Sequence, residues 1–201
     1  MLTMKPFVLI VTGPPCSGKS TLAAVLGAHL GVPLIEKDVI KEALFDSVES
    51  SGERNSRAWS RSLSNASFAA MFRLASRIVG QGGSLIVEGN FRPEHARDFE
   101  ALRAATDATL VQICCGGDGH VLLERFEERA RLGLRHPGHL DQHTIDELRE
   151  SLLLGISPPL AVVGECFAFD STSADGSQLD ELVSALARAI DSEKVGSLRA
   201  G

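Results

Sequence analysis

A glycine-rich octapeptide near the start of the chain has the residue types and spacing of a phosphate-binding loop. Residues 13–20, GPPCSGKS, match the pattern G-x-x-x-x-G-K-[ST] at every fixed position. Gly13 and Gly18 let the backbone curl so that successive N–H groups point toward one anion. Lys19 can then reach the β- and γ-phosphates of a nucleoside triphosphate, and the Ser20 hydroxyl can bind Mg²⁺. The expected nucleotide-binding residues of this loop are Gly13, Pro15, Cys16, Ser17, Gly18, Lys19, Ser20 and Thr21.

Acidic residues close three of the short apolar runs, at Asp38, Glu88 and Asp170. The carboxyl ends of parallel strands meet at one edge of a sheet, so these carboxylates are expected beside the phosphate loop. Asp38 is interpreted either as the base that receives a proton from an alcohol acceptor or as the N-cap of a helix over residues 39–45.

The turn after the run 84–87 carries further polar groups. Glu88 is interpreted as a group that holds Mg²⁺ through water, as an acceptor contact, or as a plain turn carboxylate. Asn90 and Arg92 follow on the same turn and are candidate acceptor contacts.

A charged segment, ERFEERAR, spaces Arg125 and Arg129 one helical turn apart. Arginine forks suit triphosphate oxygens, and a guanidinium plane can cover an adenine ring. The alternative is a solvated helix face of Glu–Arg pairs. A glycine-containing segment follows, which favours a closing lid over about residues 125–145, and its Arg135 is a further candidate acceptor contact. His139 and His143, with Asp141 nearby, could form a metal site, but this stretch has loop character and no cysteine support, so His136 and His139 are interpreted as hydrogen-bonding lid residues.

The elements that must position these residues alternate between strands and helices, which predicts an α/β fold. We expect a three-layer sandwich in which helices cover both faces of a five-stranded parallel sheet. The predicted strands are residues 7–11, 33–35, 84–87, 109–115 and 166–170. Two helices carry apolar residues at helical spacing, namely Leu22, Val25, Leu26 and Leu30 in the first and Trp59, Leu63, Ala66, Ala70, Leu74 and Ile78 in the second. The other predicted helices are residues 93–104, 118–132, 146–154 and 180–190.

Length and composition describe one globular domain of ordinary character. The 201 residues are 44% hydrophobic and carry a net charge of −6, which argues mildly against a nucleic-acid partner. We expect a single domain over residues 1–191, with a flexible tail over 192–201. Met1–Lys5 offers too little apolar sequence for a signal peptide, no run reaches membrane-spanning length, and the cysteines show no metal-type spacing. We therefore expect a cytoplasmic protein in which every cysteine but Cys16 is buried, and the oligomeric state stays open.

The chain resembles the P-loop small-molecule kinases, in the branch related to polynucleotide 5′-hydroxyl kinases, zeta toxins and chloramphenicol phosphotransferases. The resemblance covers most of the chain and rests on the segments GPPCSGKST, EKDVIKEAL, LIVEGNFR, ERFEERARLGLRHPGH and FDST. It implies a nucleoside-kinase-like P-loop fold with a helical lid, ATP with Mg²⁺, a base at Asp38 and lid arginines at Arg125 and Arg129. It further implies that residues 171–173, Thr172 among them, lie near the adenine.

Two departures from the family pattern concern the acceptor and the metal. Polynucleotide kinases of this branch have arginine three residues after the base, where this chain has Lys41, and many relatives have aspartate in the place of Glu88. The leading hypothesis is an ATP-dependent kinase that phosphorylates a hydroxyl of a small molecule such as a sugar, nucleoside or antibiotic. The alternatives are a 5′-hydroxyl polynucleotide kinase and a nucleotide-binding switch or regulatory ATPase without an organic acceptor. An acceptor pocket between Asp38 and Asn90 would argue against the switch.

Overall fold

A computed structural model describes residues 5–48, 56–173 and 175–196 of the chain. Its single sheet is parallel throughout, and its strand order is β2-β3-β1-β4-β5. The strands are β1 Phe7–Thr12, β2 Leu34–Glu36, β3 Leu85–Glu88, β4 Thr109–Gly116 and β5 Glu165–Asp170. The predicted five-stranded parallel sheet is confirmed, and each observed strand lies within two residues of its predicted bounds.

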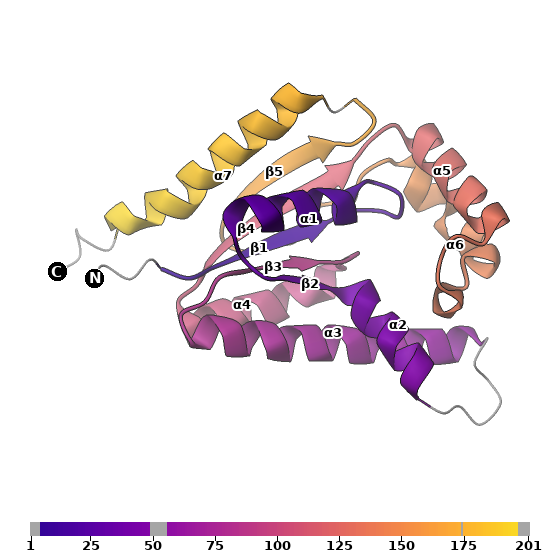
Figure 1. Cartoon of the computed structure of the whole chain (residues 1–201), viewed down its shortest axis with the longest axis horizontal. Helices are drawn as coiled ribbons and strands as arrows, with labels where there is room; N and C mark the ends of the chain where they lie inside the picture. Colours follow the sequence, from indigo (N-terminus) through magenta and orange to yellow (C-terminus); the bar gives the residue numbers. More distant parts are fainter. Residues whose placement is uncertain (1–4, 49–55, 174, 197–201) are drawn as a thin grey trace.

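Helices cover both faces of the sheet, and two more lie beyond the carboxyl ends of its strands (Figure 1). One face carries α1 Lys19–Leu30 and α7 Gly176–Gly196, while the other carries α3 Arg57–Gly80 and α4 Ala96–Thr106. The remaining elements are α2 Lys37–Ser47, the 3₁₀ turns η1 Pro93–His95 and η2 Pro137–His139, and the helices α5 Gly119–Leu132 and α6 Asp141–Leu153. α7 extends past Ser192, where the sequence predicted a tail, and residues 197–201 lie outside the described part. Helix α2 includes Asp46 and Ser47, the start of a polar stretch over residues 46–56 whose composition is typical of a mobile loop, and residues 49–55 are likewise not described.

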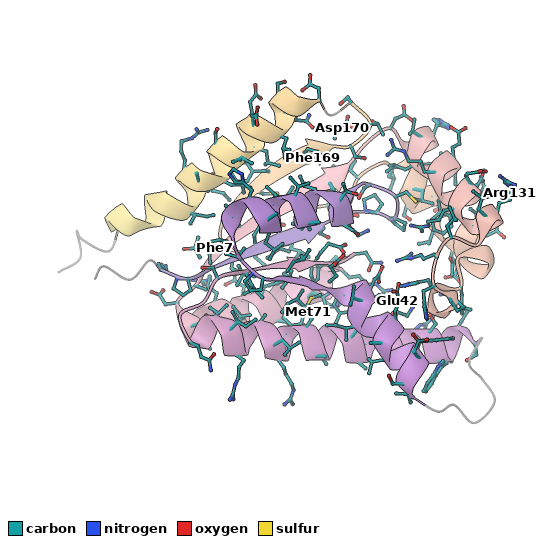
Figure 2. The ribbon with its side chains drawn as sticks, in the orientation of Figure 1. Phe7, Glu42, Met71, Arg131, Phe169 and Asp170 are labelled. Atoms are coloured by element: carbon teal, nitrogen blue, oxygen red, sulfur yellow. The ribbon has the colours of Figure 1, made fainter. Side chains whose placement is uncertain are left out.

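Two hydrophobic cores, one on each face of the sheet, hold the central strand in place. All six residues of β1 are buried, as the continuous apolar run predicts. Leu9 packs on the α1 and α7 side, whereas Ile10 packs on the α3 and α4 side with Met71. Figure 2 shows Met71 pointing from α3 toward the sheet.

The buried face of α3 differs from the predicted one by a rotation of about one residue. The helix buries Ser67 and Ala75, whereas Ala66 and Leu74 are exposed. A buried hydroxyl is tolerated at Ser67 because its Oγ donates a 2.6 Å hydrogen bond to the Leu63 carbonyl. Spacing of apolar residues alone therefore identified the wrong stripe. A smaller error of the same kind occurs in α1, where Val25 is exposed and Ala23 is buried.

Helices α5 and α6 form a hairpin with a core of its own, built on Leu122, Phe126 and Leu152. The two chain segments that join this hairpin to the sheet meet directly, since the Gly117 N–H donates a 2.9 Å hydrogen bond to the Gly155 carbonyl. They approach so closely that a Cβ on Gly119 would lie 2.0 Å from the Leu153 carbonyl oxygen, which explains the glycine at the start of α5. Both ends of the hairpin are therefore fixed at one place beside the end of β4.

The cysteines follow the prediction except at the sheet edge. Cys114 and Cys115 are buried, but Cys166 on the edge strand β5 is exposed. The Cys114 and Cys166 sulfur atoms lie 3.6 Å apart as free thiols. None of the helices in the described ranges is both long enough and apolar enough to cross a membrane.

Candidate active site

The phosphate loop joins β1 to α1 in the geometry that its sequence predicts. A Cβ on Gly13 would lie 2.4 Å from the Cys115 carbonyl oxygen, so only glycine fits there. Gly18 has a left-handed φ of 73° and directly precedes α1, whose first residue is Lys19. The N-terminal end of α1, with its unpaired N–H groups and its positive dipole, therefore faces the loop. The buried Ser17 hydroxyl, which has no hydrogen-bond partner among the described residues, is part of the same loop.

Glu88 contacts the two residues of the loop that carry side-chain chemistry. The Ser20 hydroxyl donates a 3.2 Å hydrogen bond to Glu88 Oε2, and Lys19 Nζ lies 3.7 Å from Oε1. The register of β1 and β3 produces this contact, because it pairs Glu88 with Val11 just before the loop. Burial raises the pKa of Glu88, while Lys19 opposes that shift. A hydroxyl and a carboxylate are hard oxygen donors, so Ser20 and Glu88 fit Mg²⁺.

Asp38 lies in a cluster of cationic groups. It forms ion pairs with Arg135 and with Lys37, the latter at 2.9 Å, and His139 Nδ1 lies 4.0 Å away. Burial alone would raise the pKa of Asp38, but Arg135, Lys37 and His139 outweigh that effect and hold the pKa well below its usual range. The interpretation of Asp38 as an N-cap was wrong, because α2 begins at Lys37 and Asp38 lies inside its first turn.

Two histidines attach η2 to α2, as expected of hydrogen-bonding residues in this segment. His139 Nε2 lies 2.8 Å from Glu42, and His136 Nε2 lies 3.1 Å from Asp46. Burial, together with Arg135 and two neighbouring lysines, lowers the pKa of His139 despite the adjacent Asp38 carboxylate. The side chains of residues 141–143 lie outside the described part, and no group of metal-ligating side chains occurs among those that are described.

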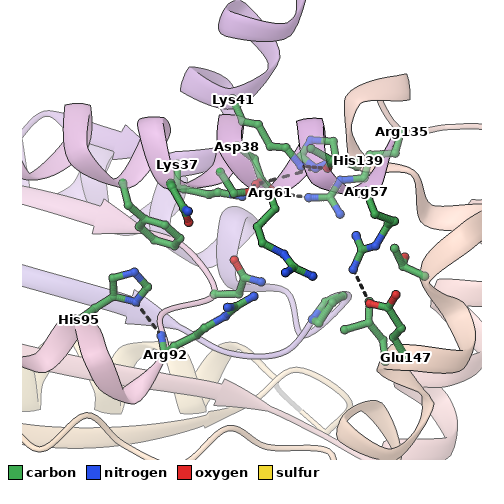
Figure 3. Close-up of a pocket in the computed structure, with 18 of the residues that line it drawn as sticks. Lys37, Asp38, Lys41, Arg57, Arg61, Arg92, His95, Arg135, His139 and Glu147 are labelled. Carbon is green, nitrogen blue, oxygen red and sulfur yellow. Dashed lines mark hydrogen bonds and ion pairs between the residues drawn. The ribbon is translucent and has the colours of Figure 1, made fainter. Parts of the chain in front are cut away.

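A cavity of about 340 Å³ opens beside Lys19 and Asp38 (Figure 3). Asn90, Arg92 and Arg135, the other predicted acceptor contacts, also line this cavity. Glu88 is the exception, since it lies against the phosphate loop and not in the cavity wall. The structure thus brings together side chains from the phosphate loop, α2, the turn after β3 and the turn after α5.

The first half of α3 supplies a wall of the cavity that sequence reasoning missed. The α3 residues that line the cavity lie one to four positions apart on one face of the helix. They are Arg57, Ser60, Arg61, Ser64, Asn65 and Phe68. This polar periodicity in the first half of a long helix is the signal that could have identified the wall. Lys41 was also missed as a cavity residue. It is buried and donates a 2.8 Å hydrogen bond to Ser60, and burial and the nearby Lys37 lower the pKa of Lys41 to about 8.

The sequence left open whether the arginines of α5 face the nucleotide site or form Glu–Arg pairs on a solvated face, and α5 contains arginines of both kinds. Arg125 Nη1 lies 3.5 Å from the Cys16 carbonyl and 3.4 Å from Ser171 Oγ, so this side chain bridges the phosphate loop and the turn after β5. Arg129 lies over the Phe126 ring, 5.1 Å from its centre. Arg131 instead pairs with Glu128 on the exposed face.

Thr172 holds the turn after β5 in place. Its hydroxyl donates a 2.6 Å hydrogen bond to Asp170 and accepts a 3.0 Å hydrogen bond from the Asp118 N–H. Asp118 in turn caps α5 by accepting hydrogen bonds from the His120 and Val121 N–H groups. The turn that the family resemblance places near the adenine is therefore connected to the start of the α5–α6 hairpin.

Comparison with known proteins identifies the architecture. A family model described as an AAA domain (AAA_33) matches residues 8–154, well over half of the chain. Uncharacterised proteins of Mycobacterium tuberculosis and Mycobacterium bovis are 30% identical over 125 residues. The matched region is 60% of this chain but 25% of those proteins, so the chain spans about a quarter of the length of the curated relatives it matches.

Solved structures show the same fold along most of the chain. A proposed kinase from Chloroflexus aurantiacus is 33% identical with a TM-score of 0.80, and the match covers 92% of this chain and 98% of the other. Chaetomium thermophilum Kti12 in complex with ADP-AlF3 is 19% identical with a TM-score of 0.65, over 91% and 98% of the two chains. A gluconokinase from Sinorhizobium meliloti is 22% identical with a TM-score of 0.53, over 96% and 98% of the chains. The latter two show the fold alone.

Proposed function

Because the chain belongs to the AAA domain family and its phosphate loop opens onto a polar cavity, we propose that it is an ATP-dependent kinase for a small-molecule alcohol. The observation that carries the proposal is the cavity itself, which adjoins Lys19 on one side and Asp38 on the other. A kinase needs a second binding site next to the γ-phosphate, whereas a switch or a regulatory ATPase uses water as the acceptor and needs none. The kinase fold of the Chloroflexus relative is consistent with this function.

In the proposed reaction the chain binds the triphosphate and aligns an alcohol with its γ-phosphate. Backbone N–H groups of the loop and Lys19 hold the β- and γ-phosphates, and their fixed positive charge stabilises the charge that spreads over the transferred group. Mg²⁺, when bound by Ser20 with Glu88 behind it, would neutralise further phosphate charge. Arg125, Arg129 and Thr172 are the proposed contacts on the nucleotide side.

Asp38 is the proposed proton acceptor. Its low pKa keeps it ionised at neutral pH, so it can orient the hydroxyl and take its proton. A carboxylate of low pKa suffices because the transition state of phosphoryl transfer is loose and demands little prior activation of the nucleophile. Asn90, Arg92 and Arg135 are the proposed acceptor contacts, and Glu88 is assigned to the metal because it accepts a hydrogen bond from Ser20.

The direct test is an acceptor screen that measures ATP consumption with Mg²⁺ across sugars, polyols, nucleosides and antibiotics. We expect an acceptor to stimulate ADP formation and to yield a phosphorylated product by mass spectrometry. ADP formation that no alcohol stimulates, with inorganic phosphate as the product, would favour the regulatory ATPase. The cytoplasmic location and the single domain over residues 1–191 remain predictions alongside this function.

A further inference from the structure

The cavity contains more positive charge than its own carboxylates balance. Its basic lining residues are Lys19, Lys37, Lys41, Arg57, Arg61, Arg92 and Arg135, and its acidic ones are Asp38, Glu94 and Glu147. One carboxylate, Asp38, pairs with two of the cations, and Glu147 pairs with Arg57. Glu88, which lies behind the cavity wall, pairs with Lys19, and even with it included the seven basic residues outnumber the four carboxylates. This excess of positive charge favours an anionic ligand.

Two of these arginines are the most available to a ligand. Arg61 forms no ion pair with any residue in the described part of the chain, although its guanidinium lies at the cavity. Arg92 approaches Glu94 only to 3.9 Å, and both side chains are more than half exposed, so that pair contributes little. Figure 3 shows both side chains directed into the cavity, Arg61 from α3 and Arg92 from the turn after β3.

We propose that the alcohol phosphorylated by this protein carries an anionic group, a carboxylate or a phosphate, which Arg61 and Arg92 bind. The inference rests on the proposed kinase function and specifies its substrate class. A guanidinium fork binds either anion through two parallel N–H···O bonds, which fixes orientation as well as charge. Held in this way, the acceptor extends from the arginines toward Asp38, where its hydroxyl must lie.

The position of the two arginines separates them from the triphosphate site. Arg61 and Arg92 belong to elements on the α3 and α4 side of the sheet, whereas α1 and the turn after β5 meet at the phosphate loop. Arg125 already provides a guanidinium beside that loop. The two cavity arginines are therefore assigned to the acceptor and not to ATP.

The dimensions of the cavity favour a small molecule over the end of a nucleic acid. Its volume of about 340 Å³ is at the low end of the range for small-ligand sites. The ion pair between Arg57 and Glu147 links α3 to α6 at the cavity wall and so limits the space for a longer ligand.

The test compares matched pairs of alcohols that differ only in an anionic group, such as glycerate with glycerol and ribose 5-phosphate with ribose. Binding is measured by calorimetry and thermal shift with a non-hydrolysable ATP analogue and Mg²⁺ present, so that the phosphate loop is filled. We expect the anionic members to bind at least about tenfold more tightly, with an advantage that shrinks as salt is added. Arg61→Gln should bring the ratio of the anionic to the neutral affinity close to one. Arg73→Gln, which removes an exposed arginine of the same helix outside the cavity, should retain it.

A second variant and a parallel measurement distinguish the possible outcomes. Arg92→Gln repeats the test independently if Arg61→Gln fails to fold, and ATP turnover with the same compounds is recorded in parallel. Anion-selective binding without turnover would support the inference and count against the kinase. Equal or absent binding of both members of every pair would overturn the inference. Phosphorylation of a 5′-hydroxyl oligonucleotide in preference to every small anion would also overturn it, in favour of the polynucleotide kinase.

Discussion

Arg135, in the turn after α5, forms an ion pair with Asp38, in the first turn of α2. The partners are 97 residues apart in sequence, and the pair links the segment predicted as a lid to the proposed proton acceptor. Only about a quarter of either side chain is exposed, so solvent screens the interaction incompletely. The ionisation of Asp38 is therefore coupled to the position of the turn after α5.

Asp38→Asn should preserve the fold and the affinity for an ATP analogue while reducing turnover by about 10²–10⁴-fold, the usual contribution of a positioned general base. The amide has nearly the same shape but cannot take a proton, and the phosphate loop that binds the nucleotide is unchanged. Nucleotide affinity by calorimetry and single-turnover phosphoryl transfer should be measured on the same preparation. Normal transfer in this variant would move the base elsewhere and weaken the kinase proposal.

Lys19→Ala should lower phosphoryl transfer by about 10²–10³-fold, since it removes one fixed charge from the transferred phosphate. The fold should survive, because Glu88, the ionic partner of Lys19, already has a raised pKa from burial and can be protonated instead. Melting temperature and turnover should be measured together. Turnover near that of the wild type in a folded variant would contradict the assignment of the loop.

Glu88→Gln should raise the Mg²⁺ concentration needed for half-maximal turnover by about 10–100-fold, as expected when a group that orients a metal ligand is neutralised. The reason is the hydrogen bond that Glu88 accepts from Ser20, the proposed Mg²⁺ ligand. A Mg²⁺ titration at saturating ATP measures the effect. Glu94→Gln is the control, because Glu94 lies at the cavity and approaches Arg92 of the turn after β3. An equal shift in both variants would argue for a general charge effect instead.

Amides of residues 125–143 should exchange with solvent faster than those of the sheet, and should slow when an ATP analogue and Mg²⁺ bind. We expect this slowing because Arg125 contacts both the phosphate loop and the turn after β5, so a nucleotide bound there would hold the segment in place. Hydrogen exchange with mass spectrometry measures this, with α4 as the internal reference. If the nucleotide leaves hydrogen exchange unchanged, Arg125 and Arg129 are ordinary surface charges and not lid residues.

Lys41 should make stability rise with pH above neutrality. Its pKa is about 8 in the folded protein and 10.5 in the reference state, so between these values the unfolded chain binds more protons than the folded one. The free energy of unfolding should therefore increase with pH through this window, by up to about 1 kcal/mol per unit. Urea denaturation of the wild type and of Lys41→Met at several pH values isolates this contribution. Parallel pH profiles for the two proteins would show that Lys41 does not titrate in this range.

The sequence was sufficient where local geometry determines the chemistry. The phosphate loop needs glycine at positions 13 and 18 for steric reasons, and those reasons apply in the folded protein. The sheet was likewise predictable, because a continuous apolar run such as β1 is buried on both faces.

What the sequence could not supply was the set of contacts between distant segments. The acidic strand ends were expected to lie at one sheet edge, but only the register of β1 and β3 directs Glu88 to Ser20 and not to the cavity. The buried stripe of α3 was misplaced because Ser67 satisfies its hydroxyl within the helix. Arg61 was missed for a related reason, since its role depends on which face of α3 borders the cavity.

The attachment of the α5–α6 hairpin has a mechanical consequence. Its two connections to the sheet are joined by the hydrogen bond from Gly117 to Gly155, and its own core ties the helices together. The rest of the hairpin is held by polar contacts to α2 and α3, among them the Arg135–Asp38 and Arg57–Glu147 ion pairs. Where those contacts open, the easiest motion left to the hairpin is a rotation about the line through its two connections. Arg125 lies two turns from this axis and Arg135 lies beyond the far end of α5, so one small angle would displace Arg135 much further. Such a rotation would move Arg125, beside the phosphate loop, only slightly, and would move Arg135, beside Asp38, the most.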